Sequence, residues 1–203
     1  LVIAGPAGSY FTGGVKPVSI WLSEGLSRAG HGGTGAAKCG GNYAASLLPT
    51  RIAQEHGCAQ VLFTDSNTDD TIDELGGMNL FLVRADGTLV TPKLNGNILD
   101  GVTRRSLIQL ARDRGHAVEE RDVTVGEWRE GAADGTITEA FACGTAAVIT
   151  PIGRLVGEEG VIVDFGERAP GELTMSLREE LTGIQFGTAA DRHGWVRPVV
   201  SAA

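Results

Sequence analysis

The chain has 203 residues, a mass of 21.1 kDa and a formal net charge of −8, which argues against nucleic acid or an anionic membrane surface as its main partner. Hydrophobic residues make up 42% of the sequence, enough for a real core, and no apolar run approaches the roughly 18 residues that a membrane span requires. Three cysteines, Cys39, Cys58 and Cys143, form no CxxC pair, so the sequence predicts neither a zinc or other metal site nor a disulfide framework and favours a reducing cytoplasm.

The first half of the chain reads as strands separated by glycine-rich and acidic loops. Strands are expected at 1–4, 18–23, 61–64, 78–83 and 88–91, loops at 5–14, 24–42 and 65–73, and a helix at 43–57. Pro49 inside that helix implies a kink or a late start. Asp86–Gly87 indicates a hairpin between the last two strands. The opening residues LVIAG lack the basic region of a signal peptide and read as a strand already under way, as expected for the remainder of a longer protein.

The second half alternates helices and strands after a turn at Asn95–Gly96. A helix is expected at 102–114, a strand at 117–124, two strands within 137–156 that break at Gly144, a strand at 160–165 and a last helix after Pro170–Gly171. Thr124 and Glu127 form a capping box for a further helix that ends at about residue 133. Because the strands and helices do not alternate as regular βαβ units, we predict an α+β fold with a largely antiparallel sheet.

The run GGTGAAKCGGNYAASL at 32–47 is the most informative stretch, because it holds Lys38, one of only three lysines, between two pairs of glycines. Glycines let the backbone take positive φ and let a flat ligand approach closely. A desolvated lysine can attack a carbonyl as a free amine, which is the chemistry that binds pyridoxal phosphate (PLP). An ordinary loop lysine is the alternative, and Tyr43 reads either as a donor to the cofactor phenolic oxygen or as a half-buried aromatic residue.

PLP also needs a carboxylate for its pyridine nitrogen and a cradle for its phosphate. Glu74, before two glycines at the start of a strand, is the candidate carboxylate, and a solvated loop acid is its alternative reading. The cradle has two candidates, 101–103 at a helix N-terminus and 144–146 at a glycine break with a hydroxyl group. Each of these segments more often binds nothing.

Taken in order, AAKCGGNY, DELGGMNLFLV, LVTPKLNGNILDGVTRRSL, ITEAFACGTAAVITPIGRL and GELTMSLREELTGIQFG closely resemble the branched-chain amino acid aminotransferases, which are PLP enzymes of fold type IV. The resemblance covers essentially all 203 residues. It implies an α+β fold, that of the C-terminal large domain of the D-amino acid aminotransferase-like (class IV) enzymes, with a largely antiparallel sheet or pseudo-barrel and flanking helices.

The resemblance also assigns roles to individual residues. Lys38 matches the Schiff-base lysine that shuttles the proton, Tyr43 the donor to the phenolic oxygen, and Glu74 the partner of the pyridine nitrogen. Phosphate ligands and substrate contacts follow from the other motifs: Val102, Thr103, Thr145 and Arg28 toward the phosphate, and Thr145, Ala146 and Gly77 toward the substrate. In this family some relatives carry threonine in place of Gly77, and the mammalian enzymes carry a redox CxxC where this chain has Ala147 and Thr150, so no thiol switch is expected there.

The implied reaction is transamination of leucine, isoleucine and valine with 2-oxoglutarate, which gives branched 2-oxo acids and glutamate. The implied assembly is a cytoplasmic homodimer with small-molecule substrates and no nucleic acid or membrane partner. Residues 1–30 are expected to be an interdomain segment and the start of the large domain, and 31–203 the PLP-binding domain, with the family's small N-terminal domain absent from this chain. A D-amino acid transaminase, an aminodeoxychorismate lyase and a non-catalytic fragment that only dimerises or binds cofactor stay open as alternatives.

Overall fold

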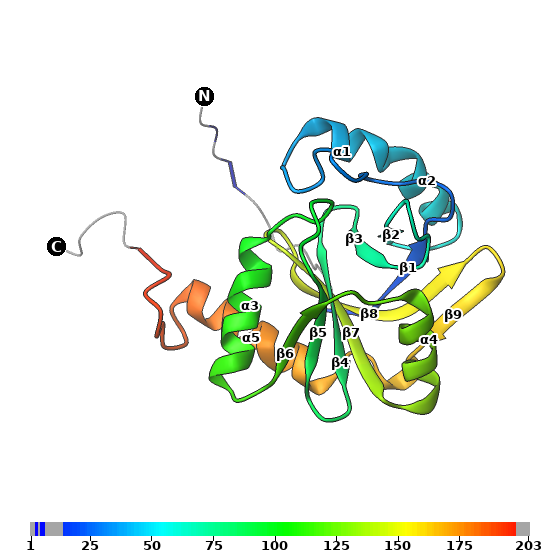
Figure 1. Ribbon diagram of the computed structural model, residues 1–203. Coiled ribbons are helices and arrows are strands. Elements are labelled where there is room, and N and C mark those ends of the chain that lie inside the picture. Colours follow the sequence, from blue (N-terminus) through cyan, green and yellow to red (C-terminus); the bar gives the residue numbers. More distant parts are fainter. Residues whose placement is uncertain (1–2, 4, 7–13, 198–203) are drawn as a thin grey trace.

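The computed structural model describes residues 3, 5–6 and 14–197. Within them nine strands form one curved sheet in the order β3-β2-β1-β8-β7-β4-β5-β6, and β9 pairs with β8 outside that path (Figure 1). The strands are β1 Val18–Leu22, β2 Gln60–Thr64, β3 Ile72–Leu75, β4 Asn79–Arg84, β5 Leu89–Pro92, β6 Val118–Arg121, β7 Ile137–Gly144, β8 Val148–Gly157 and β9 Gly160–Asp164. The helices are α1 Gly40–Ala45, α2 Leu47–Glu55, α3 Val102–Asp113, α4 Val125–Asp134 and α5 Glu172–Phe186, with a 3-10 turn η1 at Gly166–Arg168.

Antiparallel pairs dominate the sheet, as the sequence predicts. The pairs β2–β3, β4–β5, β4–β7, β7–β8 and β8–β9 are antiparallel, whereas β1–β2, β1–β8 and β5–β6 are parallel. The expected hairpin at Asp86–Gly87 joins β4 to β5, and Gly87 has the positive φ of 81° that such a turn requires. The α+β class with a largely antiparallel sheet is therefore confirmed.

The core lies on both faces of the sheet because side chains alternate along its central strands. Leu80 and Leu82 of β4 point to a cluster under α4 that contains Trp128. Phe81 and Val83 point to the opposite cluster, formed with α3 and α5. Figure 1 shows α3 and α5 side by side on one face, α4 on the other, and α1 and α2 beyond β2.

Two predicted elements differ from the structure. The helix expected at 43–57 is two helices, α1 and α2, separated at Ser46, and Pro49 lies in the first turn of α2, where its missing N–H has no helical partner to lose. The acidic loop expected at 65–73 ends sooner, because Ile72 and Asp73 already belong to β3. The strand expected at 1–4 and most of the loop expected at 5–14 lie outside the described residues.

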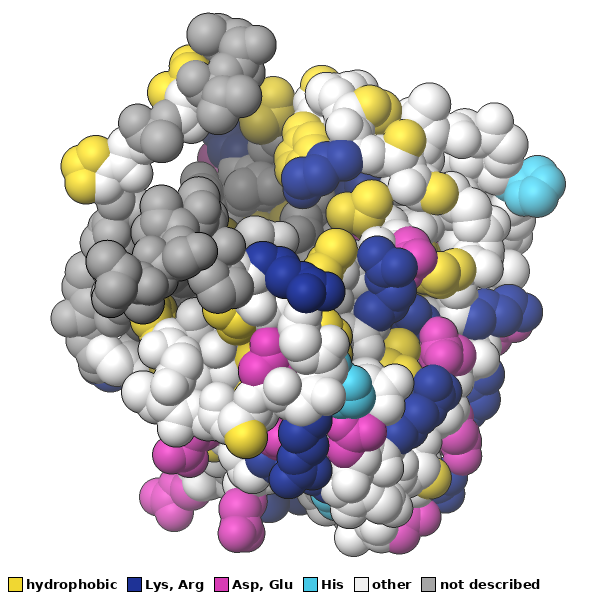
Figure 2. Space-filling view, turned by 90° about the vertical axis from the view of Figure 1, so that its left-hand side faces the viewer, with side chains coloured by type: hydrophobic (Ala, Val, Ile, Leu, Met, Phe, Trp, Pro, Cys, Tyr) yellow, Lys and Arg dark blue, Asp and Glu magenta, His cyan; other side chains and the backbone are white. Residues whose placement is uncertain are grey.

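Charged side chains of both signs intermingle on the face that Figure 2 shows. Ion pairs surround the C-terminal end of α3: Arg112 pairs with Glu120 at 3.3 Å, and Arg114, just after the helix, pairs with Glu180 of α5 at 2.6 Å. In the described part of the chain, no helix has the length and apolar character needed to cross a membrane.

Candidate functional site

Lys38 lies in the loop before α1, and its Nζ is 2.5 Å from the Tyr43 hydroxyl oxygen. The same ammonium is 5.1 Å from the centre of the Tyr43 ring. Asn42, which is only 4% exposed, shapes the loop by donating from Nδ2 to the carbonyls of Thr34 and Ala37, both at 2.8 Å. The sequence reading paired Lys38 with Tyr43 but missed Asn42, whose role depends on backbone atoms that no spacing pattern reveals.

Glu74 is buried in β3 with 3% of its surface exposed, so it is not the solvated loop acid of the alternative reading. Its Oε1 accepts hydrogen bonds from Arg28 and from the Leu99 N–H at 3.1 Å, and its Oε2 accepts one from Asn79 Nδ2 at 2.9 Å. Burial raises the pKa of Glu74 to about 7, while the Arg28 guanidinium and, more weakly, Lys38 oppose the shift.

Arg28 is 8% exposed and gathers three acceptors around its Nη2 atom. These are the Glu74 carboxylate, the Asn97 carbonyl at 2.7 Å and the Gly35 carbonyl at 3.2 Å. The resemblance assigns Arg28 to the neighbourhood of the phosphate, and that role stays a prediction. Its observed contacts give it a different one, a guanidinium that compensates the charge of Glu74.

The first candidate phosphate cradle begins α3, with Gly101 at the N-cap and Val102 68% exposed. No side chain caps this terminus, so the N–H groups of the first turn are available to an anion. Asn79, 5% exposed, connects the cradle to Glu74: its Nδ2 donates to Glu74 and to the Leu99 carbonyl at 2.9 Å, and its Oδ1 packs where a Cβ on Gly101 would lie. Asn79 is a second residue that the sequence reading missed.

The second candidate cradle is the turn between β7 and β8, where Thr145 and Ala146 are both exposed. Gly144 packs against Gly77 and Met78: a Cβ built on it would lie 3.1 Å from Met78 Cγ. A Cβ built on Gly77 would in turn lie 3.9 Å from Tyr43 Cε1. Gly77 therefore lies between the Lys38–Tyr43 pair and the Thr145 turn.

These contacts join segments that are far apart in the sequence. One set of neighbours consists of Tyr43, Gly77 and Gly144. A second set consists of Glu74, Asn79 and Gly101. The two sets come together at the turn between β3 and β4. The arrangement offers an amine beside a phenol, a buried carboxyl group and two groups of backbone donors. Within the described residues, no group of three histidine, cysteine or acidic side chains is placed to hold a metal ion.

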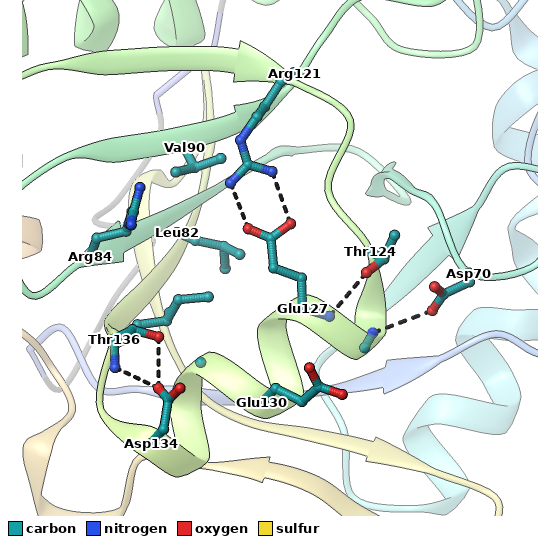
Figure 3. Close-up of a pocket in the computed structure, with 13 residues that line it drawn as sticks. Asp70, Leu82, Arg84, Val90, Arg121, Thr124, Glu127, Glu130, Asp134 and Thr136 are labelled. Carbon is teal, nitrogen blue, oxygen red and sulfur yellow. Dashed lines mark hydrogen bonds and ion pairs between the residues drawn. The ribbon is translucent and has the colours of Figure 1, made fainter.

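A separate cavity of about 560 Å³ lies between α4 and strands β4 to β6, and none of the predicted site residues lines it (Figure 3). Two of its charged groups are paired with each other: Arg121 makes two bonds to Glu127, at 2.8 and 2.5 Å. Thr124 accepts a bond from the Glu127 N–H at 2.9 Å, which confirms the N-cap that the sequence predicts. The Glu127 side chain points to Arg121, so these two residues form a structural ion pair at the start of α4, and this pair lines the cavity.

The model of the family described as Amino-transferase class IV matches residues 22–155. The branched-chain-amino-acid aminotransferase of Mycolicibacterium smegmatis is 56% identical over 199 residues, which are 97% of this chain and 54% of that protein. Branched-chain-amino-acid aminotransferase 2 of Bacillus subtilis is 43% identical and is matched over 99% of this chain and 55% of its own length. The chain thus spans about half the length of the curated relatives it matches.

Solved structures agree with this relationship. The branched-chain amino acid aminotransferase of Escherichia coli superimposes with a TM-score of 0.78 at 33% identity, over 94% of this chain and 59% of that one. The enzyme of Thermobaculum terrenum in its PLP form gives a TM-score of 0.77 at 30% identity, over 92% and 57%. The fold is therefore that of the class IV aminotransferases, and the chain belongs to that family.

Proposed function

We propose that this chain carries the PLP-binding part of a branched-chain amino acid aminotransferase, with residues 31–203 as the cofactor domain and 1–30 as the segment that leads into it. The observation that carries the proposal is the Lys38 amine, 2.5 Å from the Tyr43 hydroxyl and in electrostatic range of the buried Glu74 carboxyl group. The names of the relatives support leucine, isoleucine and valine as amino donors. A cytoplasmic homodimer with 2-oxoglutarate as the second substrate completes the proposal.

The residues present fit the cofactor. Within the described part of the chain, Lys38 has a phenol and no carboxylate as its hydrogen-bond partner, so no ion pair has to break before the amine meets an aldehyde. Glu74 is a buried carboxyl group whose neutral and cationic donors stabilise its charged form, which is the form that would stabilise a protonated pyridine nitrogen. When bound, PLP supplies an aldehyde and an electron-accepting ring.

The chain's own groups have separate tasks in this proposal. Lys38 holds the cofactor and moves the proton from the substrate α-carbon, a general acid–base task that typically contributes ~10²–10⁴-fold to the rate. Tyr43 orients the amine and donates to the phenolic oxygen. Glu74 holds the proton at the pyridine nitrogen. Val102 and Thr103 bind the phosphate with N–H and hydroxyl groups, and Thr145 and Ala146 supply donors to phosphate and to the substrate carboxylate, beside Gly77.

Borohydride trapping tests the assignment of Lys38. The protein, expressed from its complete coding sequence, is incubated with PLP and reduced, and peptide mass spectrometry locates the phosphopyridoxyl group. We expect the label on Lys38, its loss in Lys38→Ala and its retention in the matched control Lys93→Ala, since Lys93 lies on the surface in an ion pair with Asp122. A yellow, reducible species that persists in Lys38→Ala refutes the assignment.

Single-turnover kinetics test Glu74 and the substrate class. Glu74→Gln is expected to keep PLP bound and to slow the proton-abstraction half-reaction, because the amide holds no proton at the pyridine nitrogen as a carboxylate does. Loss of binding with an unchanged rate in the protein that still binds contradicts this role.

Half-reactions with L-leucine, D-alanine and aminodeoxychorismate separate the proposal from a D-amino acid transaminase or a lyase, and inactivity with all three indicates a non-catalytic chain. Light scattering at twice the mass of one chain is the expected result for the homodimer.

A further inference from the structure

The loop that carries Lys38 rests on the turn Asn95–Gly96–Asn97. The Ala36 N–H donates to the Gly96 carbonyl at 2.9 Å. Gly35 packs directly on the Asn97 backbone, so a Cβ on Gly35 would collide with the Asn97 Cα and carbonyl atoms. Because the backbones of Gly35 and Asn97 are in direct contact, the position of the loop depends on the position of the turn.

Asp73 holds this turn from the side of the sheet. Its Oδ1 accepts a bond from Asn95 Nδ2 at 2.8 Å, and its Oδ2 accepts one from Asn97 Nδ2 at 3.2 Å. Asp73 is 4% exposed and Asn97 is 2% exposed, so water does not readily replace the bond between them. Burial raises the pKa of Asp73, and the two amide groups oppose that shift.

Arg28 connects the loop and the turn to Glu74. One nitrogen, Nη2, donates to the Gly35 carbonyl of the loop, to the Asn97 carbonyl of the turn and to the Glu74 carboxylate. Asp73 and Glu74 are adjacent in β3. A single strand therefore presents one acid to the turn that supports Lys38 and the next acid to the cofactor site.

We propose that Asp73 is a positioning residue that fixes the Asn95–Gly96–Asn97 turn and, through Gly35 and Ala36, sets the place of Lys38 relative to Glu74. The consequence for Lys38 chemistry rests on the proposed function, whereas the docking of the loop does not. Without both acceptor oxygens of Asp73 the turn loses an anchor, the loop opens more often, and the Lys38 amine spends less time beside Tyr43.

Hydrogen exchange in the cofactor-free protein tests the docking. Asp73→Asn keeps the size of the side chain but faces an amide group with another amide, so one of the two bonds is lost. We expect exchange of the amides of 33–38 to rise about tenfold in this variant. Glu139→Gln is the matched control, since Glu139 also accepts backbone hydrogen bonds but at the start of α5, and we expect it to leave exchange of the loop unchanged.

A second pair of variants tests the contact between the loop and the turn by a substitution in the loop. Gly35→Ala introduces a methyl group that the Asn97 backbone excludes, whereas Gly30→Ala adds one in the same loop at an ordinary 3.8 Å from Ser66 Oγ. Gly35→Ala is expected to raise loop exchange like Asp73→Asn, and Gly30→Ala is expected to match the wild type. Circular dichroism identifies folded variants, and if Asp73→Asn does not fold, the glycine pair decides.

The rate of borohydride-trapped labelling of Lys38 by PLP separates positioning from a purely structural role. We expect it to fall about tenfold in Asp73→Asn and Gly35→Ala and to stay at the wild-type value in both controls, even where Glu139→Gln lowers the melting temperature. Loop exchange or labelling rates in folded Asp73→Asn and Gly35→Ala that equal those of the controls overturn the proposal. If the wild type takes no label on Lys38, the proposed function fails, and loop exchange alone still decides whether Asp73 fixes the loop.

Discussion

At the scale of single residues, Glu74 combines deep burial with a charged partner. The carboxyl group loses hydration on folding, which raises its pKa to about 7, and Arg28 recovers part of that loss. A pKa raised above the usual value of 4.5 means that the folded state binds the proton more tightly than the unfolded state. Stability contributed by this group therefore falls as pH rises from about 4.5 to about 7.

Glu74→Gln removes that dependence because an amide does not titrate. Between pH 5 and pH 7, we expect the free energy of unfolding of the cofactor-free wild type to fall relative to Glu74→Gln by on the order of 1 kcal/mol. Urea unfolding at a series of pH values measures the difference between the two proteins, in which the contributions of titratable groups that do not interact with Glu74 cancel. A difference that is flat or that increases with pH contradicts the direction of the shift.

Val148 is a β-branched residue in the left-handed region, with a φ of 59°. It pairs with Gly144 at the start of β8, directly after the turn 145–147 that joins β7 to β8. Alanine normally stabilises a folded chain more than glycine, but a left-handed site reverses the order. We expect Val148→Gly to be more stable than Val148→Ala by about 1 kcal/mol, as measured by urea unfolding.

The exposed edge-strand residue Val161 serves as the control for this comparison. There the ordinary order should hold, with Val161→Ala more stable than Val161→Gly. The same order at both positions would mean that Val148 carries no backbone strain. The comparison matters for the site because the strained residue closes the turn that holds Thr145 and Ala146.

How far the sequence reveals the site depends on how local each contact is. Lys38 and Tyr43 are five residues apart, so their proximity follows from the chain itself. Glu74 was identified as a candidate, but the polar run before it disguised its burial, which comes from packing against distant residues such as Leu99. Asn42 and Asn79 act mostly through backbone carbonyls, and no pattern of residue types marks such contacts.

At the scale of secondary structure, helix α5 owes its start to a residue of another element. Glu139 of β7 accepts bonds from the Leu173 and Thr174 N–H groups at 3.1 and 2.8 Å and from the Thr174 hydroxyl at 2.6 Å. Its carboxyl group fills the space where a side chain on Gly171 would lie. A carboxylate at a helix N-terminus satisfies free donors and interacts favourably with the helix dipole.

Glu139→Ala leaves these donors without a partner, including the fully buried Thr174. We expect a loss of about 2 kcal/mol in the free energy of unfolding. Glu158→Ala, in the exposed turn between β8 and β9, is the control and should change stability by less than about 0.5 kcal/mol. Equal effects of the two substitutions would exclude a capping role for Glu139.

Local sequence patterns predict which helices and strands exist better than they predict the residues at which these elements begin and end. The N-cap at Thr124 and the helix stop at Gly115 are sequence patterns with a direct structural cause, and the structure has both. The second half of the predicted capping box differs, because the Glu127 side chain bonds to Arg121. The sequence does not predict strand β3 as a separate element, because the polar residues before it indicate a loop over 65–73. Pro49 predicts a kink or a late start of the helix at 43–57, whereas the structure has two helices that meet at Ser46, whose N–H and hydroxyl both bond to the Tyr43 carbonyl.

At the scale of the whole molecule, strand order follows from contacts that the sequence does not display. The hairpins β4–β5, β7–β8 and β8–β9 join neighbouring segments and were within reach of the sequence reading. The parallel pair β1–β8 joins Val18 to Ile152, and its partners are chosen by burial over the whole sheet. The sheet is what brings the loop before α1, β3 and the start of α3 together, so the predicted site residues could be named before their arrangement was known.

One sheet with cores on both faces should unfold as a unit. Phe81 and Leu82 are adjacent in β4, each is 0% exposed, and they point into the two different cores. Phe81→Leu and Leu82→Val remove little volume, so each should cost about 1 kcal/mol and leave the protein folded. Because both cores depend on β4, we expect either substitution to lower a single urea midpoint that is the same by far-UV circular dichroism and by tryptophan fluorescence.

Tryptophan positions make this test selective. Trp128 is in the same core as Leu82 and Trp21 packs with α2 in a third cluster, whereas circular dichroism reports on the helices and strands of the whole sheet. Trp195 lies beside Leu181 and Ile184 of α5, which belong to the core that contains Phe81, so both variants are made in a Trp195→Phe background. If the two faces unfolded independently in that background, Leu82→Val would shift the fluorescence midpoint, while Phe81→Leu would shift only the transition followed by circular dichroism. Coincident midpoints in both variants, with an unchanged dependence on urea, mean that a defect on either face of the sheet is transmitted to the strand that holds Glu74 and to the loop that carries Lys38.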